Sequence, residues 1–548
     1  MSTANKIDNS RLSPNTVRIN GADAIEHIRA WLLDAGYAES ATRALTRGTP
    51  QDQDAAQKAS ELPEVQLLLA GSPLPAAQAK ALFTVDDLKE WVAAGLLAKT
   101  RKEVLPLVRI MPFRGLLVVS DCEHAAQARS HPDLVMGLTG SSSRLADFII
   151  PADSQCTLDM GTGAGITAML AARHSKQVVA TDVNPRALEF ARFNAALNEI
   201  DNIEFIEGDM FGAVEGRTFD LILSKPLFPV SPAKGCRYSE NPSGDESIRH
   251  FAQTAPSYLN NGGYAQIVHN WVQRNGDDWP DRVSGWLKTS GCDAWVVRGM
   301  SSSPADYGRK WLEGYDTANV EKLLGAWIAD CEKQGIASID GGLITMRRSE
   351  AQQNWVRVDS ELPRIFPDAG VHVARCFGLQ DFLNRVPGSD LLNEILYLSP
   401  SVELTQTCKS TMKGMKLQRC EITMTRGIAY SMTLDPAIAR VVTSCNGRLQ
   451  LGQLMQAVAM EDGEELEVVV AHYLGAIRRL VMLGFLWPAR RGTLGTVSAL
   501  EESKPGQAEP EAGPDDAKVD SSATAKEAMP NEKVAKAGNS KGKTASRN

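Results

Sequence analysis

A glycine-rich turn between an apolar run and a helical run constrains the fold of this chain more than any other feature. Gly161, Gly163 and Gly165 stand at alternate positions in the turn, and the helical pattern Ile166–His174 follows it. A second apolar run then ends on Asp182. Strand, glycine turn, helix, strand and acid in this order form the first half of a nucleotide-binding βαβ unit. Glycine lets the backbone approach a ligand closely, and the helix N-terminus offers free N–H groups to an anion or a carboxylate.

Two details of the turn favour an amino-acid-bearing nucleoside over a dinucleotide. The glycines are spaced G-x-G-x-G, whereas dinucleotide-binding turns have the spacing G-x-G-x-x-G. Asp159 ends the first strand just before the turn, and a carboxylate there repels a pyrophosphate but suits an ammonium group. Asp182 can accept hydrogen bonds from both hydroxyls of a ribose. An NAD-dependent dehydrogenase is therefore the least supported interpretation.

Five sequence blocks, in matching order and spacing, resemble the class I S-adenosylmethionine (SAM) methyltransferases. They are LDMGTGAG (158–165), TDVNPRAL (181–188), ARFNAALN (191–198), EGDMF (207–211) and FDLILSKPLFPVSP (219–232). The resemblance implies an α/β fold with a Rossmann-like, seven-stranded methyltransferase sheet, and SAM as the cofactor. It assigns Asp159, Gly161, Gly163 and Gly165 to the methionine end of SAM and the backbone turn around it.

The same resemblance assigns three further residues to the donor site. Asp182 is the ribose acid, with a helix N-cap as the structural alternative. Asp209 and Met210 follow the third strand, where these enzymes bind the adenine amino group and cover the ring. The alternative for Asp209 is a solvated loop acid. Three asparagines are expected to cap or brace helices without a ligand role: Asn184, Asn194 and Asn198.

The end of the fourth strand is the most diagnostic site. Ser224-Lys225-Pro226-Leu227-Phe228 resembles the Asn-Pro-Pro-Phe/Tyr motif of release-factor glutamine methyltransferases, small-domain rRNA guanine methyltransferases and adenine-N6 methyltransferases. In that motif the Asn and a backbone carbonyl accept hydrogen bonds from the target NH₂ group, and the aromatic ring stacks on its plane. Catalysis is then mainly positioning. The resemblance makes Lys225, Pro226 and Phe228 the catalytic positions.

Lys225 departs from the motif because it stands where the Asn should be, and Leu227 replaces the second Pro. Lysine has three donors and no acceptor, so it cannot orient an NH₂ group as Asn does. Lys225 either pairs with a carboxylate or phosphate on an altered substrate, or lies outside the site while backbone carbonyls position the acceptor. In a third hypothesis, methyl transfer is lost and the domain is kept for binding. A cation beside the sulfonium also opposes SAM binding unless an acid intervenes.

Downstream motifs resemble a subfamily of long bacterial methyltransferases with an N-terminal helical domain and a C-terminal winged-helix-like domain. The motifs are Phe228-Pro229-Val230-Ser231-Pro232, Arg237-Tyr238 and Gly244-Asp245. Arg237 is either an anion clamp at the acceptor mouth or a surface loop arginine. Trp271 closes the fifth strand at the carboxyl edge of the sheet, where it either lines the acceptor pocket or packs in the core.

Composition and hydrophobic patterning divide the 548 residues into five segments. We expect a disordered leader at 1–20, an N-terminal α+β domain at 21–125, a SAM-dependent methyltransferase domain at 126–350, a C-terminal winged-helix-like domain at 351–490 and a disordered tail at 491–548. The tail has almost no large apolar residues and cannot bury enough surface to fold. The winged-helix-like segment fits either a nucleic-acid or peptide-binding module or a scaffold or dimerisation domain, and its acidic stretch 454–470 favours the scaffold or dimerisation domain.

Apolar runs predict seven strands in the methyltransferase domain: Thr157–Asp159, Val178–Asp182, Ile203–Glu207, Leu221–Ser224, Tyr264–His269, Ala294–Arg298 and Leu343–Arg347. The last two, with a Gly-Gly turn at 341–342, fit the antiparallel edge pair that closes methyltransferase sheets. Residues 304–334 predict helices whose aromatic residues pack. An earlier hairpin is predicted around Pro112-Phe113-Arg114-Gly115.

The composition is that of a soluble globular protein, with 43% hydrophobic and 23% charged residues. A net charge of -8 argues against a protein that coats nucleic acid generally, although a local basic patch stays open. No apolar run approaches the length of a membrane span, and the polar N-terminus lacks the core of a secretory signal. Nine scattered cysteines without a C-x-x-C pair argue against a zinc site or a disulfide framework. We therefore expect a cytoplasmic protein without a metal.

The sequence thus predicts a SAM-dependent methyltransferase that transfers a methyl group to a nucleophile, nitrogen first among the candidates. The acceptor is a protein, an RNA or another molecule such as a metabolite. The alternative is a catalytically degenerate SAM- or partner-binding pseudoenzyme.

Overall fold

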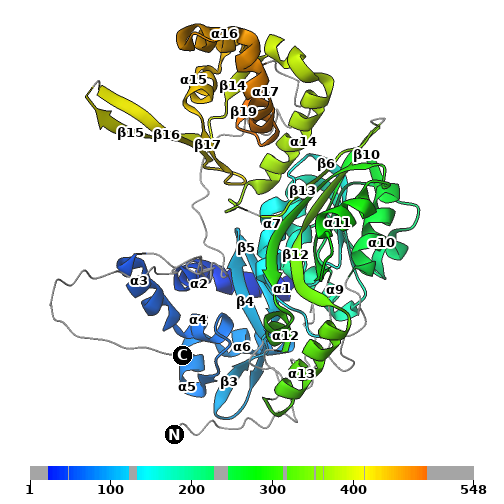
Figure 1. Cartoon of the computed structure of the whole chain (residues 1–548). Coiled ribbons are helices and arrows are strands. Elements are labelled where there is room, and N and C mark those ends of the chain that lie inside the picture. Colours follow the sequence, from blue (N-terminus) through cyan, green and yellow to red (C-terminus); the bar gives the residue numbers. More distant parts are fainter. Residues whose placement is uncertain are drawn as a thin grey trace, which may run out of the picture.

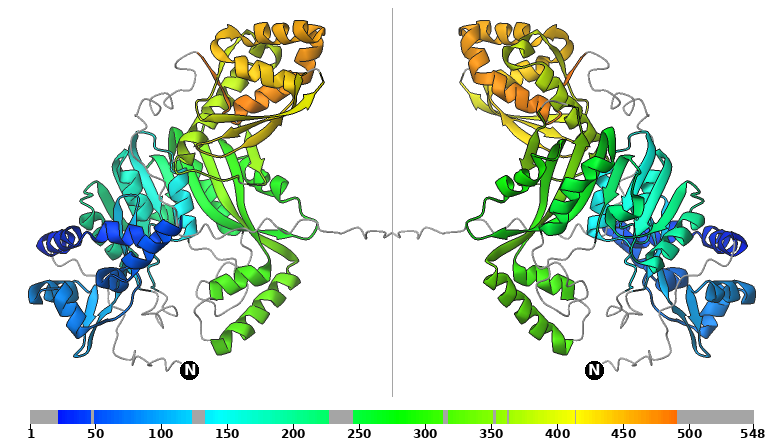
Figure 2. Two further views of the ribbon diagram at one scale, coloured as in Figure 1. Left: turned by 90° about the vertical axis from the view of Figure 1, so that its left-hand side faces the viewer. Right: turned by 90° about the vertical axis from the view of Figure 1, so that its right-hand side faces the viewer.

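The computed structural model describes residues 22–46, 49–122, 133–226, 245–312, 317–350, 353–361, 363–412 and 414–489. The predicted leader and tail lie outside these ranges. Figure 1 shows three parts in chain order: N-terminal helices with a hairpin, a large central sheet, and a C-terminal unit at the opposite end of the molecule from the N-terminal part. The side views in Figure 2 show the same order of parts.

The central sheet has eight described strands in the order β13-β11-β12-β10-β9-β6-β7-β8. Their bounds are β6 (Ser154–Met160), β7 (Ser175–Asp182), β8 (Ile203–Glu207), β9 (Phe219–Ser224), β10 (Leu259–Arg274), β11 (Cys292–Ser302), β12 (Ile336–Arg348) and β13 (Val356–Asp359). Strands β6 to β10 run parallel, and β12 pairs antiparallel with both β10 and β11. All seven predicted strands are confirmed. β13 adds an eighth strand, which pairs parallel with β11. β13 begins after residue 350, beyond the predicted end of the methyltransferase domain.

Gly341 and Gly342 lie inside β12, so the turn predicted there is wrong. Both glycines pair with residues of the neighbouring strands β10 and β11. A Cβ on Gly342 would lie 2.2 Å from the carbonyl oxygen of Val297 and 2.6 Å from the ring of Trp271. Gly342 is therefore required because a neighbouring backbone and an aromatic ring approach it closely. Close approach of this kind is a common reason for glycine inside a strand.

Helices cover both faces of the sheet, as a doubly wound pattern requires. Their bounds are α7 (Gly140–Phe148), α8 (Ile166–Ala172), α9 (Pro185–Leu197), η4 (Met210–Val214), α10 (Glu246–Thr254), η5 (Ala255–Tyr258), α11 (Trp279–Leu287), α12 (Pro304–Leu312) and α13 (Thr317–Lys333). α8 and α9 share one apolar core with Leu223 on one face of the sheet, and α10 and α11 share another with Ile222 on the other face. α12 and α13 bury Tyr307 and Trp327 against β12, so the packing role predicted for this region is confirmed.

The N-terminal part has six described helices and five short strands. They are α1 (Ala22–Asp34), α2 (Tyr37–Leu45), α3 (Pro50–Ser60), α4 (Pro63–Leu68), β1 (Leu74–Pro75), α5 (Ala76–Leu82), α6 (Val85–Ala93), β2 (Leu97–Lys99), β3 (Glu103–Pro106), β4 (Val108–Phe113) and β5 (Leu116–Asp121). The predicted hairpin is confirmed as β4 and β5, with Arg114 and Gly115 at φ angles of 50° and 73° in the turn. The core of this part continues into the core beneath α8 and α9.

The C-terminal unit has its own apolar core. Its elements are α14 (Ala369–Arg385), η6 (Gly388–Asn393), β14 (Ile395–Leu398), β15 (Val402–Thr411), β16 (Gly414–Met424), β17 (Ser431–Leu434), α15 (Pro436–Ser444), β18 (Asn446–Gln450), α16 (Leu451–Asp462), α17 (Leu466–Met482) and β19 (Leu486–Pro488). They form two three-stranded sheets, β18-β14-β19 and β15-β16-β17, and the β15–β16 hairpin projects away from the helices (Figure 1). The winged-helix interpretation stays a prediction.

Candidate functional site

The glycine turn, the acid at the end of β7 and the loop after β9 meet at the carboxyl edge of the sheet. β6 lies between β7 and β9, so the strand order reverses beside it. Open α/β sheets bind ligands at such a switch point. A Cβ on Gly161 would lie 3.7 Å from the Cα atom of Pro226, so the turn lies against the loop after β9. The structure thus brings together Asp159, Gly161, Gly163, Gly165, Asp182, Lys225 and Pro226.

Gly165 and Gly163 serve different purposes in the turn. Gly165 precedes α8 at a φ of 82°, and a Cβ there would lie 3.0 Å from the Cβ and 3.1 Å from the Cα of Ala191 in α9. A side chain at Gly165 would therefore push two helices apart. At Gly163 an added Cβ would meet no atom of the described residues within 4 Å. The space beside the turn is open there, as a ligand cradle requires.

Asp182 holds the glycine turn through backbone hydrogen bonds. Its Oδ2 accepts the N–H of Gly163 at 2.9 Å, and its Oδ1 accepts the N–H of Asn184 at 2.9 Å. Burial raises the pKa of this carboxyl group, and the backbone hydrogen bonds work in the opposite direction. Asn184, as predicted, is the N-cap of α9, where its side chain accepts the N–H of Arg186. Asp182 therefore places a carboxylate next to the turn and fixes the shape of the turn.

Asp159 is almost fully buried at the end of β6, with 2% of its surface exposed. Its Oδ2 accepts the hydroxyl of Thr162 at 2.6 Å, a contact that the sequence interpretation did not include. Burial raises the pKa of Asp159 to about 7; the Thr162 hydrogen bond opposes this rise, Asp182 adds to it and Lys225 also opposes it. A buried carboxyl group with this pKa gains a strong preference for ionisation when a cation binds beside it.

Lys225 follows β9 directly and is half-buried. Burial lowers the pKa of its ammonium group, while the nearby carboxyl groups of Asp159 and Asp182 raise it. Lys225 therefore lies within electrostatic range of both acids of the expected donor site. Ser224, immediately before it, donates its hydroxyl to the carbonyl oxygen of Met160 at 3.2 Å and ties this loop to β6.

Asp209 and Met210 lie at the same edge of the sheet, after β8. Asp209 is exposed, and Met210 is partly buried at a φ of 46°, which is uncommon for a residue with a side chain. The N–H of Gly208 donates to the carbonyl oxygen of Asp182 at 3.0 Å, so this loop adjoins the acid of β7. Their adenine-binding role stays a prediction.

Three further residues are predicted to contact the acceptor: Trp271, Phe228 and Arg237. Trp271 is fully buried in β10, with its ring stacked on Trp279 at a centroid distance of 5.6 Å. The structure thus places Trp271 in the apolar core on this face of the sheet, and its role at an acceptor pocket stays a prediction. Phe228 and Arg237 lie outside the described residues.

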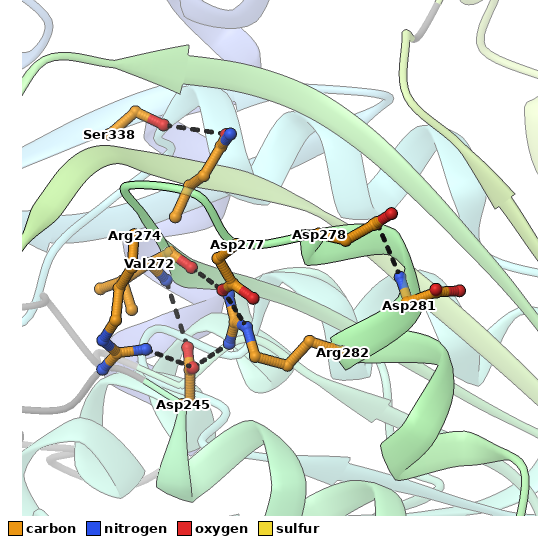
Figure 3. Close-up of polar contacts among 9 residues, drawn as sticks. Asp245, Val272, Arg274, Asp277, Asp278, Asp281, Arg282 and Ser338 are labelled. Atoms are coloured by element: carbon orange, nitrogen blue, oxygen red, sulfur yellow. Dashed lines mark hydrogen bonds and ion pairs between the residues drawn. The ribbon is translucent and has the colours of Figure 1, made fainter.

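Asp245, from the predicted Gly-Asp motif, forms a network of ion pairs at the start of α10 (Figure 3). Its carboxylate pairs with Arg282 and, at 3.5 Å, with Arg274, and it accepts the N–H of Val272 at 3.2 Å. Arg282 also pairs with Asp277 at 2.6 Å. This network fastens the start of α10 to the end of β10. No local signal in the sequence links the two arginines to Asp245.

His269 and Ser247 lie close to this network. The Nε2 atom of His269 and the hydroxyl of Ser247 are 3.0 Å apart, and the Nδ1 atom lies 2.5 Å from the carbonyl oxygen of Asn270. Burial lowers the pKa of His269 to about 4, so the ring is neutral near pH 7. Its N–H therefore points to the carbonyl oxygen, and Nε2 accepts the hydroxyl of Ser247.

The described residues hold no group of three or more His, Cys, Asp or Glu side chains that could bind a metal ion. Among the described helices, none combines the length and the apolar character that crossing a membrane demands.

Comparison with known proteins places these features in a family. The methyltransferase small domain matches residues 139–277, and a domain of unknown function matches residues 374–488. The release factor glutamine methyltransferase of Xylella fastidiosa strain 9a5c is 35% identical over 135 residues, which are 22% of this chain and 49% of that protein. A provisionally named protein N5-glutamine methyltransferase of Methanocaldococcus jannaschii is 32% identical over 148 residues, which are 26% of this chain and 74% of that protein.

A ribosomal protein L11 methylase from Lactobacillus delbrueckii, of known structure, is 24% identical, with coverage of 30% of this chain and 74% of that one and a TM-score of 0.22. The chain spans about half the length of the first of these relatives. The sequence blocks, the geometry of the site and the small-domain match all indicate the same class of enzyme. The chain belongs to the class I SAM-dependent methyltransferases with a methyltransferase small domain.

Proposed function

We propose that this chain transfers the methyl group of SAM to a nitrogen atom, with the side-chain amide of a protein glutamine as the first acceptor to test. The observation that carries the proposal is the glycine turn clamped by Asp182 beside the buried Asp159 and against Pro226. The glutamine acceptor follows from the names of the two relatives, a release factor glutamine methyltransferase and a protein N5-glutamine methyltransferase.

The residues around the turn fit the donor molecule. Asp182 would accept the ribose hydroxyls, and Gly163 leaves room for the ligand to approach the backbone. Asp159 would ionise and attract the ammonium group of the methionine end. When bound, SAM supplies a methyl group on a sulfonium, which is transferred to a nucleophile. Release of the methyl group needs no metal from the protein, so the chain's task is to bind, orient and exclude water.

Lys225 decides how the acceptor is held. Because its ammonium group lies near Asp159 and Asp182, we infer that it faces the donor side, and that carbonyl oxygens of the loop Ser224–Pro226 orient the acceptor NH₂ group. This matches the hypothesis of backbone positioning in place of the missing Asn. Lysine has no acceptor lone pair with which to replace that Asn.

A pseudoenzyme that binds SAM without turnover is the second candidate, favoured by the same Lys225. Calorimetry should detect SAM binding under both proposals. Only the enzyme would release S-adenosylhomocysteine when purified release factor is added. No release with release factor, RNA or cell extract, despite measured SAM binding, would favour the pseudoenzyme.

Replacing Lys225 with Asn is expected to tighten SAM binding about tenfold, because a cation beside the sulfonium and the two acids is removed. Turnover should persist. Calorimetry and S-adenosylhomocysteine release measure the two quantities, with the exposed Lys288→Asn as a matched control. Loss of turnover with unchanged SAM affinity would instead assign Lys225 to an anion on the acceptor.

The SAM affinity of the parent protein relative to that of Asp159→Asn is expected to rise by about tenfold between pH 6 and pH 8, because Asp159 has a pKa of about 7 and attracts the cationic donor when it is ionised. The pKa of this group is raised above its ordinary value, so below pH 7 it is mainly neutral and above pH 7 mainly charged. Asp159→Asn removes this titration but leaves that of the donor's own amino group. Calorimetry at several pH values gives the SAM affinity of both proteins. The contribution of Asp159 is the difference between their pH profiles. Parallel pH profiles would contradict its role.

A further inference from the structure

A cavity of about 410 Å³ lies where the central sheet meets the C-terminal unit. Its walls come from β13, the edge strand of the sheet, and from α14, β17 and α17. This volume is in the range of small-molecule sites. The cavity is far along the sheet from the glycine turn, since four strands separate β13 from β6. It is therefore distinct from the expected donor site.

One carboxylate lines this cavity, and it is already paired with an arginine. Asp359 accepts two hydrogen bonds from Arg357, at 3.0 and 2.6 Å. It also accepts the indole N–H of Trp295 at 3.0 Å and the hydroxyl of Tyr430 at 2.7 Å. The charge of Asp359 is thus balanced by Arg357, and its Oδ2 atom already accepts three hydrogen bonds.

Two further arginines line the cavity without a carboxylate partner among the described residues. Arg478 donates to the carbonyl oxygens of Val386 at 3.0 Å and Leu383 at 3.2 Å, at the end of α14. Arg479 is exposed, and its backbone carbonyl oxygen accepts the N–H of Leu483 at 3.0 Å, but within the described ranges its guanidinium group has no hydrogen bond or ion pair. Arg478 and Arg479 therefore leave the cavity with positive charge that an anion would neutralise.

Apolar side chains form the other part of the lining: Leu383, Met432, Met482 and Leu483. An inorganic anion alone would leave this surface in contact with water. We propose that the cavity binds a small organic anion, in which a phosphate or carboxylate meets Arg479 and Arg478 and an apolar or aromatic body lies on the methionine and leucine side chains. The bound molecule would bridge the edge of the sheet and the C-terminal unit.

Gly475 provides a direct way to close the cavity. It lies on α17 one turn before Arg479 and lines the same space. A Cβ at this position would meet no atom of the described residues within 4 Å, and the backbone is helical. The backbone and the Cβ position thus accept a side chain, and we expect the leucine of Gly475→Leu to occupy the cavity without loss of helix stability.

Phenyl phosphate is the probe, and saturation-transfer NMR reports its binding to the full chain. We expect millimolar affinity, weakened at least roughly tenfold in Gly475→Leu and in Arg479→Glu. Inorganic phosphate has no carbon-bound protons to observe, so it is tested as a competitor and should bind at least roughly tenfold more weakly than phenyl phosphate. Gly325→Leu is the matched glycine control, since Gly325 is exposed in α13 and an added Cβ there also meets no described atom within 4 Å. Arg43→Glu, an exposed helical arginine of α2, controls for charge.

The proposal fails if phenyl phosphate shows no transfer up to roughly 10 mM, or if Gly475→Leu binds it as well as the parent protein does. It also fails if the two control variants lose binding equally, because the site would then lie elsewhere. Equal affinity for phenyl phosphate and inorganic phosphate would exclude a contribution from the apolar wall.

Discussion

Asp182→Ala is expected to weaken SAM binding at least roughly 100-fold, because it would remove the two charge-assisted hydrogen bonds that we propose between Asp182 and the ribose. The same substitution releases the N–H groups of Gly163 and Asn184, which the carboxylate holds at 2.9 Å in the structure. The turn then loses the clamp that gives it its shape. Titration calorimetry measures the SAM affinity, and activity should fall in parallel.

The matched control for this result is Asp201→Ala. Asp201 is an exposed loop acid just before β8, at the opposite end of the strands from Asp182. Its removal changes the net charge by the same amount but should leave SAM affinity within about twofold. If Asp182→Ala bound SAM as tightly as Asp201→Ala, the donor site would have to lie elsewhere.

Asn194→Ala is expected to lower the free energy of unfolding by about 3 kcal/mol, because it leaves buried backbone groups without partners. Asn194, on α9, is fully buried. Its amide accepts the N–H of Val119 at 2.8 Å, and donates to the carbonyl oxygens of Val119 at 2.9 Å and Ala164 at 2.8 Å. This one side chain thus fastens the N-terminal hairpin and the glycine turn to the same helix.

Urea denaturation followed by tryptophan fluorescence measures this loss. Asn384→Ala in α14 is the matched control, because Asn384 is an exposed helical asparagine whose removal should cost less than about 0.5 kcal/mol. A change below about 1 kcal/mol in Asn194→Ala would mean that the hairpin and the turn are held by other contacts.

The sequence predicted the buried centres of the strands better than their ends. β10 extends from Leu259 to Arg274, whereas the apolar run covers only Tyr264–His269. Apolar patterning marks the part of a strand that is packed on both sides, and the ends pair through backbone groups that carry no sequence signal. For the same reason the exposed-edge strand β13 was missed, because its residues are only partly buried.

Local spacing in the sequence was sufficient to predict the glycine turn and its two acids, because these residues are close together in the chain and contact one another directly. The bracing role of Asn194 and Asn198 is confirmed; Asn198 accepts the N–H of Leu117 at 2.9 Å and donates to its carbonyl oxygen at 2.8 Å. The proximity of Lys225 to Asp159 and the burial of Trp271 depend on which way a side chain leaves the sheet. That direction is set by tertiary packing, which a single sequence does not contain.

The central claim, transfer of a methyl group by this site, is tested most directly by incubating the protein with methyl-labelled SAM and cell extract. The extract is then separated into protein, RNA and metabolite fractions, with Asp182→Ala run in parallel. We predict label in the protein fraction, on a nitrogen atom, and none with Asp182→Ala. Absence of label from every fraction, in a preparation that binds SAM by calorimetry, would contradict the claim.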